Sequence, residues 1–139
     1  MLIVAECISS YEEVEKLVRH ISSRLSLFKE FVNQSLIFSI EFCLRELLNN
    51  AVEHGNQFDG AKKIQCLFHY IDGEIYISVK DEGMGFCVES ALEEIDCEDM
   101  MRSRTRGLKT LTLLGFELDC KNGWVIAKKS IGSGKEGQF

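Results

Sequence analysis

Two dipeptides, Asp72-Gly73 and Asn122-Gly123, constrain the fold of this chain more than any other feature of its sequence. Asp-Gly and Asn-Gly are preferred centres of the tight two-residue turns that join antiparallel strands. Apolar and polar residues alternate on both sides of each dipeptide, which is the period of a half-buried strand. The strand-like segments are 64–71, 74–80, 116–120 and 124–129. The sequence therefore predicts two β-hairpins within an antiparallel sheet.

Helical periodicity occupies most of the remaining chain. Apolar residues recur every three or four positions over 11–27 and over 36–54, where Gly55 is expected to end the helix. A shorter helix is expected over 108–114, and a strand over 2–8. The order β-α-α-β-β-loop-α-β-β predicts an α+β fold: a two-layer α/β sandwich, with a mixed, mostly antiparallel sheet covered by helices on one face.

Composition limits the classes of partner. The 139 residues are expected to form one domain, 1–139, and 45% apolar with 27% charged residues is a globular balance. A net charge of −6 opposes binding to nucleic acid or anionic membrane, so neither is expected as a direct partner. The six cysteines are scattered without a CxxC pair, which disfavours zinc and fits a reducing, cytoplasmic location. Cys43 and Cys66 lie in apolar runs and are expected in the core.

The second expected helix carries a first group of polar residues. Glu46, Asn50 and His54 are spaced four apart, so a helix places them along one ridge. An amide oxygen at Asn50 could bind a hard cation such as Mg²⁺, and Glu46 could act as a general base beside it. The alternative is an ordinary solvated flank of the helix.

A glycine-rich loop follows the 74–80 strand directly. Asp81 could accept a hydrogen bond from an exocyclic amine such as that of adenine. Gly83 and Gly85 would allow the backbone to approach a ligand closely. The alternative is a simple turn, since turns are rich in Asp and Gly.

A cluster of positive charge stands where the third expected helix begins. Four of the eight residues in 102–109 are Arg or Lys, in a chain that is acidic overall. A helix N-terminus edged by cations is a ready phosphate site. The alternative is that these residues pair with the acidic residues of 93–99 across a surface loop.

Taken together, the three segments resemble the boxes of the Bergerat-fold (GHKL) ATPases, and most closely those of the bacterial anti-sigma factor serine/threonine kinases. The first box is ELLNNAVEHGN, residues 46–56. The second is DEGMGF, residues 81–86, and the third is TRGL, residues 105–108. The resemblance covers nearly the whole chain, and the length matches that of a free-standing kinase.

The resemblance implies a role for each residue. Glu46 would be the general base and Asn50 the Mg²⁺ ligand, while Asp81 would read adenine above a floor formed by Gly83 and Gly85. The cofactors would be ATP and Mg²⁺, with residues 87–109 as a mobile lid and 131–139 as a mobile tail. The further ATP-binding residues would be His54, Arg104, Thr105, Arg106, Gly107, Leu108 and Lys109.

The resemblance also implies partners. Such a kinase phosphorylates a serine or threonine of an antagonist protein, holds a sigma factor or a similar regulator inactive, and works as a homodimer. Two residues depart from the family pattern: Thr105 stands where glycine usually opens the phosphate box, and Trp124 replaces a threonine after Gly123. These departures favour an alternative, a nucleotide-gated binding module with weak or no phosphate transfer.

Overall fold

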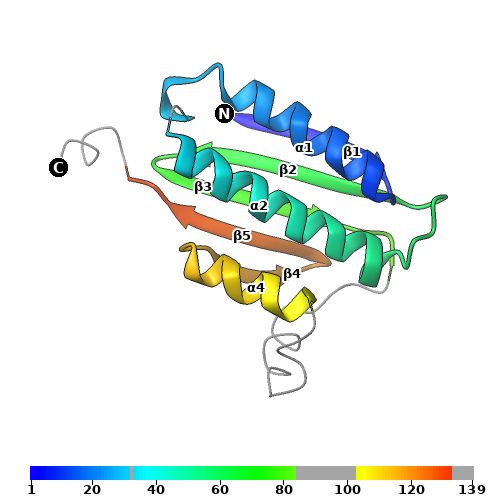
Figure 1. Ribbon diagram of the computed structural model, residues 1–139. Helices are drawn as coiled ribbons and strands as arrows, with labels where there is room; N and C mark the ends of the chain where they lie inside the picture. The colour runs from blue at the N-terminus through cyan, green and yellow to red at the C-terminus, as the bar shows by residue number, and fades with distance from the viewer. Residues whose placement is uncertain (32, 84–102, 133–139) are drawn as a thin grey trace.

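A computed structural model describes residues 1–31, 33–83 and 103–132 of the chain (Figure 1). The elements, in chain order, are β1 (Leu2–Ile8), α1 (Tyr11–Leu25), the short helix η1 (Lys29–Phe31), α2 (Gln34–Asn50), the π-helical turn η2 (Ala51–Gly55), β2 (Lys63–Ile71), β3 (Glu74–Lys80), α4 (Ser103–Leu113), β4 (Glu117–Lys121) and β5 (Trp124–Ser130).

The five strands form one sheet in the order β1-β2-β3-β5-β4. The predicted α+β sandwich is confirmed, with one refinement: every pairing among the described strands is antiparallel, so the sheet is not mixed there. Asp72, Gly73, Asn122 and Gly123 all have positive φ, as a tight two-residue hairpin turn of this class requires. Both predicted hairpins are therefore confirmed.

The helices α1, α2 and α4 lie side by side on one face of the sheet (Figure 1). The core lies between the two layers, where α1 and α2 bury their apolar stripes against inward-facing strand residues such as Phe68 and Ile77. Cys43 and Cys66 are fully buried there, as predicted. Burial raises the pKa of the Cys66 thiol to about 12. The other face of the sheet carries no helix in the described part of the chain (Figure 1).

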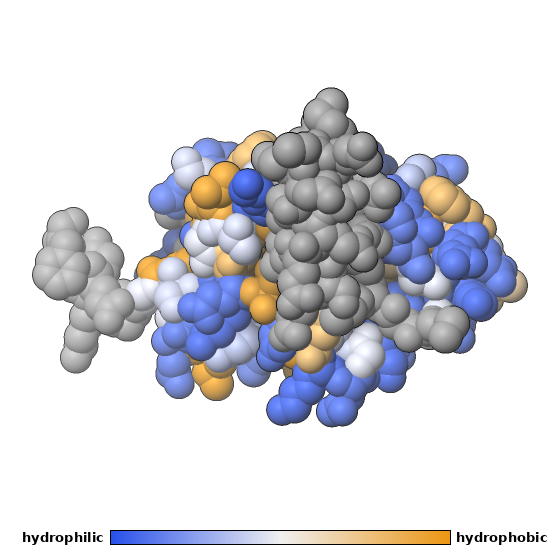
Figure 2. Space-filling view, turned by 90° about the horizontal axis from the view of Figure 1, so that it is seen from below, coloured by the Kyte–Doolittle hydropathy of each residue, from blue (hydrophilic) through white to orange (hydrophobic). Residues whose placement is uncertain are grey.

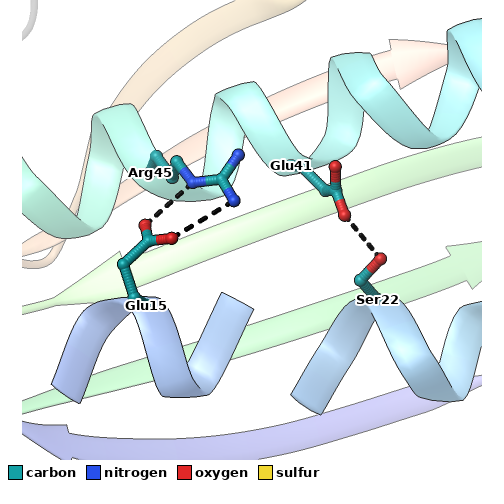
Figure 3. Close-up of polar contacts among 4 residues, drawn as sticks. All are labelled: Glu15, Ser22, Glu41 and Arg45. Atoms are coloured by element: carbon teal, nitrogen blue, oxygen red, sulfur yellow. Dashed lines mark hydrogen bonds and ion pairs between the residues drawn. The ribbon is translucent and has the colours of Figure 1, made fainter. Parts of the chain in front are cut away.

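Polar contacts fix α1 against α2 above this core (Figure 3). Nε of Arg45 donates to Glu15 over 2.8 Å and Nη2 donates to its other oxygen over 3.3 Å, a two-bond pair that defines one relative position of the helices. Ser22 donates a further bond of 2.6 Å to Glu41. Arg45 immediately precedes Glu46, so this pair also fixes the part of α2 that carries the expected base.

Two helix boundaries differ by more than two residues from the sequence prediction. α4 begins at Ser103, five residues before the predicted Leu108. Arg and Lys are good helix formers, so this segment is helical although it lacks an apolar stripe to reveal it. α2 ends at Asn50, and the last turn, 51–55, is π-helical where an α-helix was expected to run to His54.

The described surface is mixed in character. Seen from the side of α4 and β4, separate apolar patches lie between hydrophilic areas (Figure 2). None of the helices in the described ranges is both long and apolar enough to cross a bilayer. Gly85, residues 87–102 of the expected lid and residues 133–139 of the expected tail lie outside the described residues.

Candidate functional site

The C-terminal end of α2 carries the two residues with the most specific predicted chemistry. Glu46 is half-buried, and Asn50, one turn later, is only 4% exposed. The π-helical turn that follows is closed by a bond of 2.7 Å from the backbone N–H of Asn56 to the carbonyl of Ala51. Single π-helical turns are frequently found at functional sites. The end of α2 is thus shaped differently from a plain amphipathic helix.

Glu46 lies directly against α4. A methyl group on Gly107 would come within 1.9 Å of Oε2 of Glu46, so only glycine leaves room for the carboxylate in its present position. Burial raises the pKa of Glu46 to about 7, and the negative charge of Glu53 adds to that shift. A carboxylate with a pKa near neutrality is suited to accept and release a proton at physiological pH.

Asn50 has the character of a residue that lacks its ligand. Its buried Nδ2 has no hydrogen-bond partner among the described residues, whereas buried polar atoms are nearly always paired. No group of three or more His, Cys, Asp or Glu in the described ranges could hold a metal. A hard cation here would therefore need the Asn50 amide oxygen together with oxygens of a ligand such as phosphate, whereas the unpaired Nδ2 is a donor and suits an acceptor such as a phosphate oxygen.

A second cluster joins the end of η2 to the loop after β3. The Asp81 carboxylate accepts a 2.8 Å bond from the N–H of Gly83 through Oδ1. Its Oδ2 packs on Gly55, where a methyl group would lie 2.0 Å away, and a methyl group on Gly83 would meet the Gly55 carbonyl oxygen at 1.8 Å. The predicted pair Asp81 and Gly83 is thus held against Gly55, which sequence reasoning had treated only as a helix end.

Asn56 positions this loop, and sequence reasoning assigned it no role. It is 1% exposed. Its Nδ2 donates to Ser9 over 2.5 Å and to the carbonyl of Lys63 over 3.0 Å, and its Oδ1 accepts from the N–H of Glu82 over 2.8 Å. One side chain therefore ties three segments together beside Asp81. The only signal in the sequence was its place at the end of the first box.

Other predicted site residues are placed less favourably for ligand binding. His54 is exposed, and its Nε2 lies 3.5 Å from Oε1 of the neighbouring Glu53. The turn that carries His54 is π-helical, so the four-residue spacing no longer places His54 on the ridge of Glu46 and Asn50. Leu108 is fully buried in the core, so its side chain is not available to a phosphate, whereas Lys109 is exposed.

The predicted helix start near Leu108 is wrong, since α4 begins earlier. The backbone of Arg104, Thr105 and Arg106 lies in the first turn of α4 and Gly107 in the next. The orphan N–H groups of this helix therefore include those of Ser103, Arg104 and Thr105, and the last two are predicted phosphate-binding residues. The helix N-terminus and the basic segment still coincide.

A charged hollow of about 420 Å³ adjoins the loop that follows β3. Besides Asp81 and Gly83, it is lined by Glu6, Gln65 and Lys80, strand residues that point away from the helices. It includes neither Glu46 nor Asn50, so it is separate from the cluster on the helix side.

Comparison with known families decides the class of the protein. The family model of the histidine kinase-like ATPase domain matches residues 8–111, about three quarters of the chain. The chain belongs to the histidine kinase-like ATPase family. A search of curated proteins found no match. This histidine kinase-like domain is therefore an ATP-binding domain of the GHKL type, and the match includes Glu46, Asn50, Asp81 and Gly107.

Proposed function

We propose that the protein is an ATP- and Mg²⁺-dependent serine/threonine kinase that phosphorylates an antagonist protein. It would also hold a sigma factor or a similar regulator inactive, and would work as a homodimer in the cytoplasm. The observation that carries the kinase proposal is the Glu46 carboxylate. It has a pKa near 7, it is half-buried, and in this GHKL domain it lies one turn before Asn50, whose buried Nδ2 has no partner among the described residues.

Glu46 would act on the substrate hydroxyl. The oxygen of a serine or threonine attacks the γ-phosphorus of ATP, the bond from that phosphorus to the β–γ bridging oxygen breaks, and ADP leaves. The hydroxyl proton passes to Glu46, which Gly107 holds at the point where α2 meets α4. Glu46 is suited to this step because its pKa lets it exist as the carboxylate at neutral pH and still bind a proton.

Asn50 would bind Mg²⁺ through its amide oxygen. The cation would neutralise charge on the phosphates. The Asn50 side chain is buried, and its unpaired Nδ2, a donor, would bond to a phosphate oxygen of the same ligand. Asp81 would accept the adenine amine through the carboxylate that Gly55 and Gly83 position. Arg104, Arg106 and Lys109 would supply positive charge near the phosphates.

One observation favours the second candidate, a nucleotide-gated binding module. Trp124 pairs with Lys80 in the register of β5 and β3, and the Lys80 ammonium lies 5.9 Å from the indole ring. Lys80 immediately precedes Asp81. The departure from the family pattern therefore lies beside the proposed adenine site, where it would change how the nucleotide is seated and so reduce phosphate transfer.

The deciding experiment compares binding with transfer. The partner is captured from native lysate with and without ATP, identified, purified, and then incubated with the protein and labelled ATP. Glu46→Gln should keep ATP affinity within a few-fold and lose detectable transfer, since a general base contributes about 10²–10⁴-fold to a rate. Asn50→Ala should weaken both Mg²⁺-ATP binding and transfer, and Asp81→Asn should weaken binding of ATP with or without Mg²⁺.

Each result has a defined meaning. Wild-type protein that binds ATP and the identified partner but transfers no phosphate is the binding module. Transfer by Glu46→Gln at the wild-type rate removes Glu46 from the role of base. Absence of any ATP-dependent rise in melting temperature at millimolar ATP contradicts the nucleotide site itself, because saturating ligand must stabilise the folded state.

A further inference from the structure

Two aromatic side chains are exposed side by side at the end of the helix layer that carries Glu46. Tyr11 is the first residue of α1 and Phe58 follows η2, and their rings meet edge to face with centroids 5.5 Å apart. Tyr11 is 48% exposed and Phe58 is 58% exposed. The N-terminal end of α1 and the C-terminal end of α2 lie at the same end of this layer (Figure 1). These two rings, the aromatic pair, therefore form a surface open to solvent beside the candidate site.

The backbone fixes the position of Phe58. Gln57 and Phe58 have φ of 51° and 60°, a left-handed conformation that is unusual for residues other than glycine. The N–H of Phe58 donates to the carbonyl of Val52 over 2.8 Å, which ties this turn to η2. The turn thus presents a phenylalanine ring to solvent from an unfavourable backbone conformation. Residues in such conformations cluster at active sites and ligand clamps.

The aromatic pair is connected to the proposed base through Glu53. The Tyr11 hydroxyl donates to Oε2 of Glu53 over 2.5 Å. Glu53 is close enough to Glu46 for its negative charge to raise the Glu46 pKa. Glu53 follows Glu46 by seven residues, which corresponds to roughly 10 Å along a helix. A substrate bound at the aromatic pair would therefore lie within reach of Glu46.

The chain around the aromatic pair is acidic. The segments 10–13 and 53–59 contain four carboxylates and neither lysine nor arginine. Lys16 offsets the two carboxylates of α1, while Glu53 bonds to Tyr11 and Asp59 is the next residue after Phe58. A cation is attracted to the faces of aromatic rings as well as to carboxylates, and the planar guanidinium of arginine stacks on rings and pairs with carboxylates better than an ammonium does. The surface therefore fits an arginine side chain.

We propose that the aromatic pair docks an arginine of the substrate protein and so places its serine or threonine at Glu46. This inference rests on the kinase of the proposed function and names the feature of the substrate that the kinase recognises. An extended chain spans about 3.3 Å per residue, so a distance of roughly 10 Å corresponds to about three residues. The arginine is therefore expected about three residues from the phosphorylated serine or threonine.

The first test uses a synthetic peptide, ARAASAARA, in which an arginine stands three residues before and three residues after one serine. A matched peptide carries citrulline in place of both arginines, which keeps the planar shape and removes the charge. Titration of the wild-type protein, followed by NMR, should shift the ring resonances of Tyr11 and Phe58 with the arginine peptide and not with the citrulline peptide. Equal shifts from both peptides, or no shift at either ring, overturn the proposal.

The second test separates the aromatic pair from other exposed rings. Phe58→Asn removes the ring and suits the positive φ, because asparagine tolerates the left-handed conformation. It should weaken binding of the arginine peptide about two- to fivefold, the value of one cation–π contact at an exposed site. Phe38→Ala is the matched control, since Phe38 is 60% exposed and lies in the N-terminal half of α2, and it should leave the affinity unchanged. Equal affinities of Phe58→Asn and the wild type overturn the proposal.

Nucleotide binding and phosphate transfer are measured separately. Phe58→Asn should keep the ATP-dependent rise in melting temperature, because Phe58 is outside the candidate nucleotide site. A protein that binds the arginine peptide at the aromatic pair but transfers no labelled phosphate keeps this docking surface and is a binding module, so the kinase is then wrong. Transfer to the peptide with the same KM in the wild type and in Phe58→Asn keeps the kinase and overturns the docking surface.

Discussion

The carboxylate of Glu46 on α2 packs against the α-carbon of Gly107 on α4, so closely that a methyl group at Gly107 would come within 1.9 Å of Oε2. The two residues are far apart in sequence and belong to different family boxes. The position of the proposed base is therefore set by the absence of a side chain on another helix. This contact gives Gly107 a physical role besides the phosphate contact that the resemblance implied.

Gly107→Ala should reduce phosphate transfer with little loss of stability. The new methyl group must push the Glu46 carboxylate aside, and it can do so because that carboxylate is the end of a flexible side chain. Alanine also favours a helix by up to about 1 kcal/mol over glycine, which offsets strain. We expect transfer to fall about tenfold or more, measured with labelled ATP, while the melting temperature changes by only a few degrees.

Gly60→Ala is the matched control for that substitution, because nothing lies within 4 Å of a methyl group there. It should leave transfer unchanged. A Gly107→Ala enzyme that transfers phosphate at the wild-type rate would show that the contact with Glu46 does not position the base.

The raised pKa of Glu46 predicts a pH dependence of both activity and stability. Its folded pKa is about 7, above the ordinary carboxyl value of 4.5. The folded state therefore binds the proton more tightly than the unfolded state, and its contribution to stability is full below about 4.5 and is lost as pH rises through 7. Activity has the opposite sign, since the base works as the carboxylate, and should fall as pH drops below 7.

Glu46→Gln isolates this group, because glutamine keeps the shape and cannot ionise. Thermal unfolding of both proteins across pH 5–8 should show the variant gaining stability relative to wild type as pH rises. The difference should be a few degrees at most, since the carboxylate is only half-buried. A constant difference at all pH values would contradict the raised pKa.

The parts of the fold predicted from sequence are those decided by short-range chemistry. Asp72-Gly73 and Asn122-Gly123 fix their turns locally, because only a few residues tolerate positive φ, and the strands around them alternate clearly. The π-helical turn at 51–55 was not predictable in this way, since the residues there also suit an α-helix. The contacts around this turn come from distant segments: Asp81 packs on Gly55 at its end, and the side chain of the next residue, Asn56, bonds to Ser9, Lys63 and Glu82.

The candidate site was predicted as a set of residues and not as an arrangement. Glu46, Asn50 and Asp81 carry recognisable chemistry, and a spacing of four indicates a shared helix face. The contacts that position them involve glycines whose neighbours come from distant segments: Gly107 against Glu46, and Gly55 against Asp81. These contacts depend on tertiary packing between distant segments, which a local sequence pattern cannot predict.

Gly83→Ala should be far more damaging than Gly107→Ala. The added methyl group would lie 1.8 Å from the backbone carbonyl oxygen of Gly55, and a backbone cannot swing away as a side chain does. The loop after β3 must move, and Asp81 moves with it. We expect ATP affinity, measured by calorimetry, to fall at least about tenfold, again with Gly60→Ala as the control. Unchanged affinity would separate this loop from the adenine site.

Asn56 offers a sharper test of how the loop is held. Asn56→Asp keeps an oxygen that can accept from the N–H of Glu82, and removes the donor that serves both Ser9 and the Lys63 carbonyl. It also buries a negative charge beside that carbonyl. Because an unsatisfied buried group costs about 1–3 kcal/mol, we expect a loss of roughly 2–4 kcal/mol in the free energy of unfolding, measured in urea, together with weaker ATP binding.

Ser9→Ala separates the contributions within this network. It removes only the Ser9 hydroxyl that accepts from Asn56 over 2.5 Å, and it leaves the bonds of the Asn56 side chain to the Lys63 carbonyl and the Glu82 N–H. Its cost should be about 1 kcal/mol, with ATP affinity close to that of the wild type, since the bond to Glu82 beside Asp81 is kept. The two variants therefore differ in ATP binding as well as in stability. If Ser9→Ala weakens ATP binding as much as Asn56→Asp does, the turn after β1 must position Asp81 by some route other than the Glu82 bond.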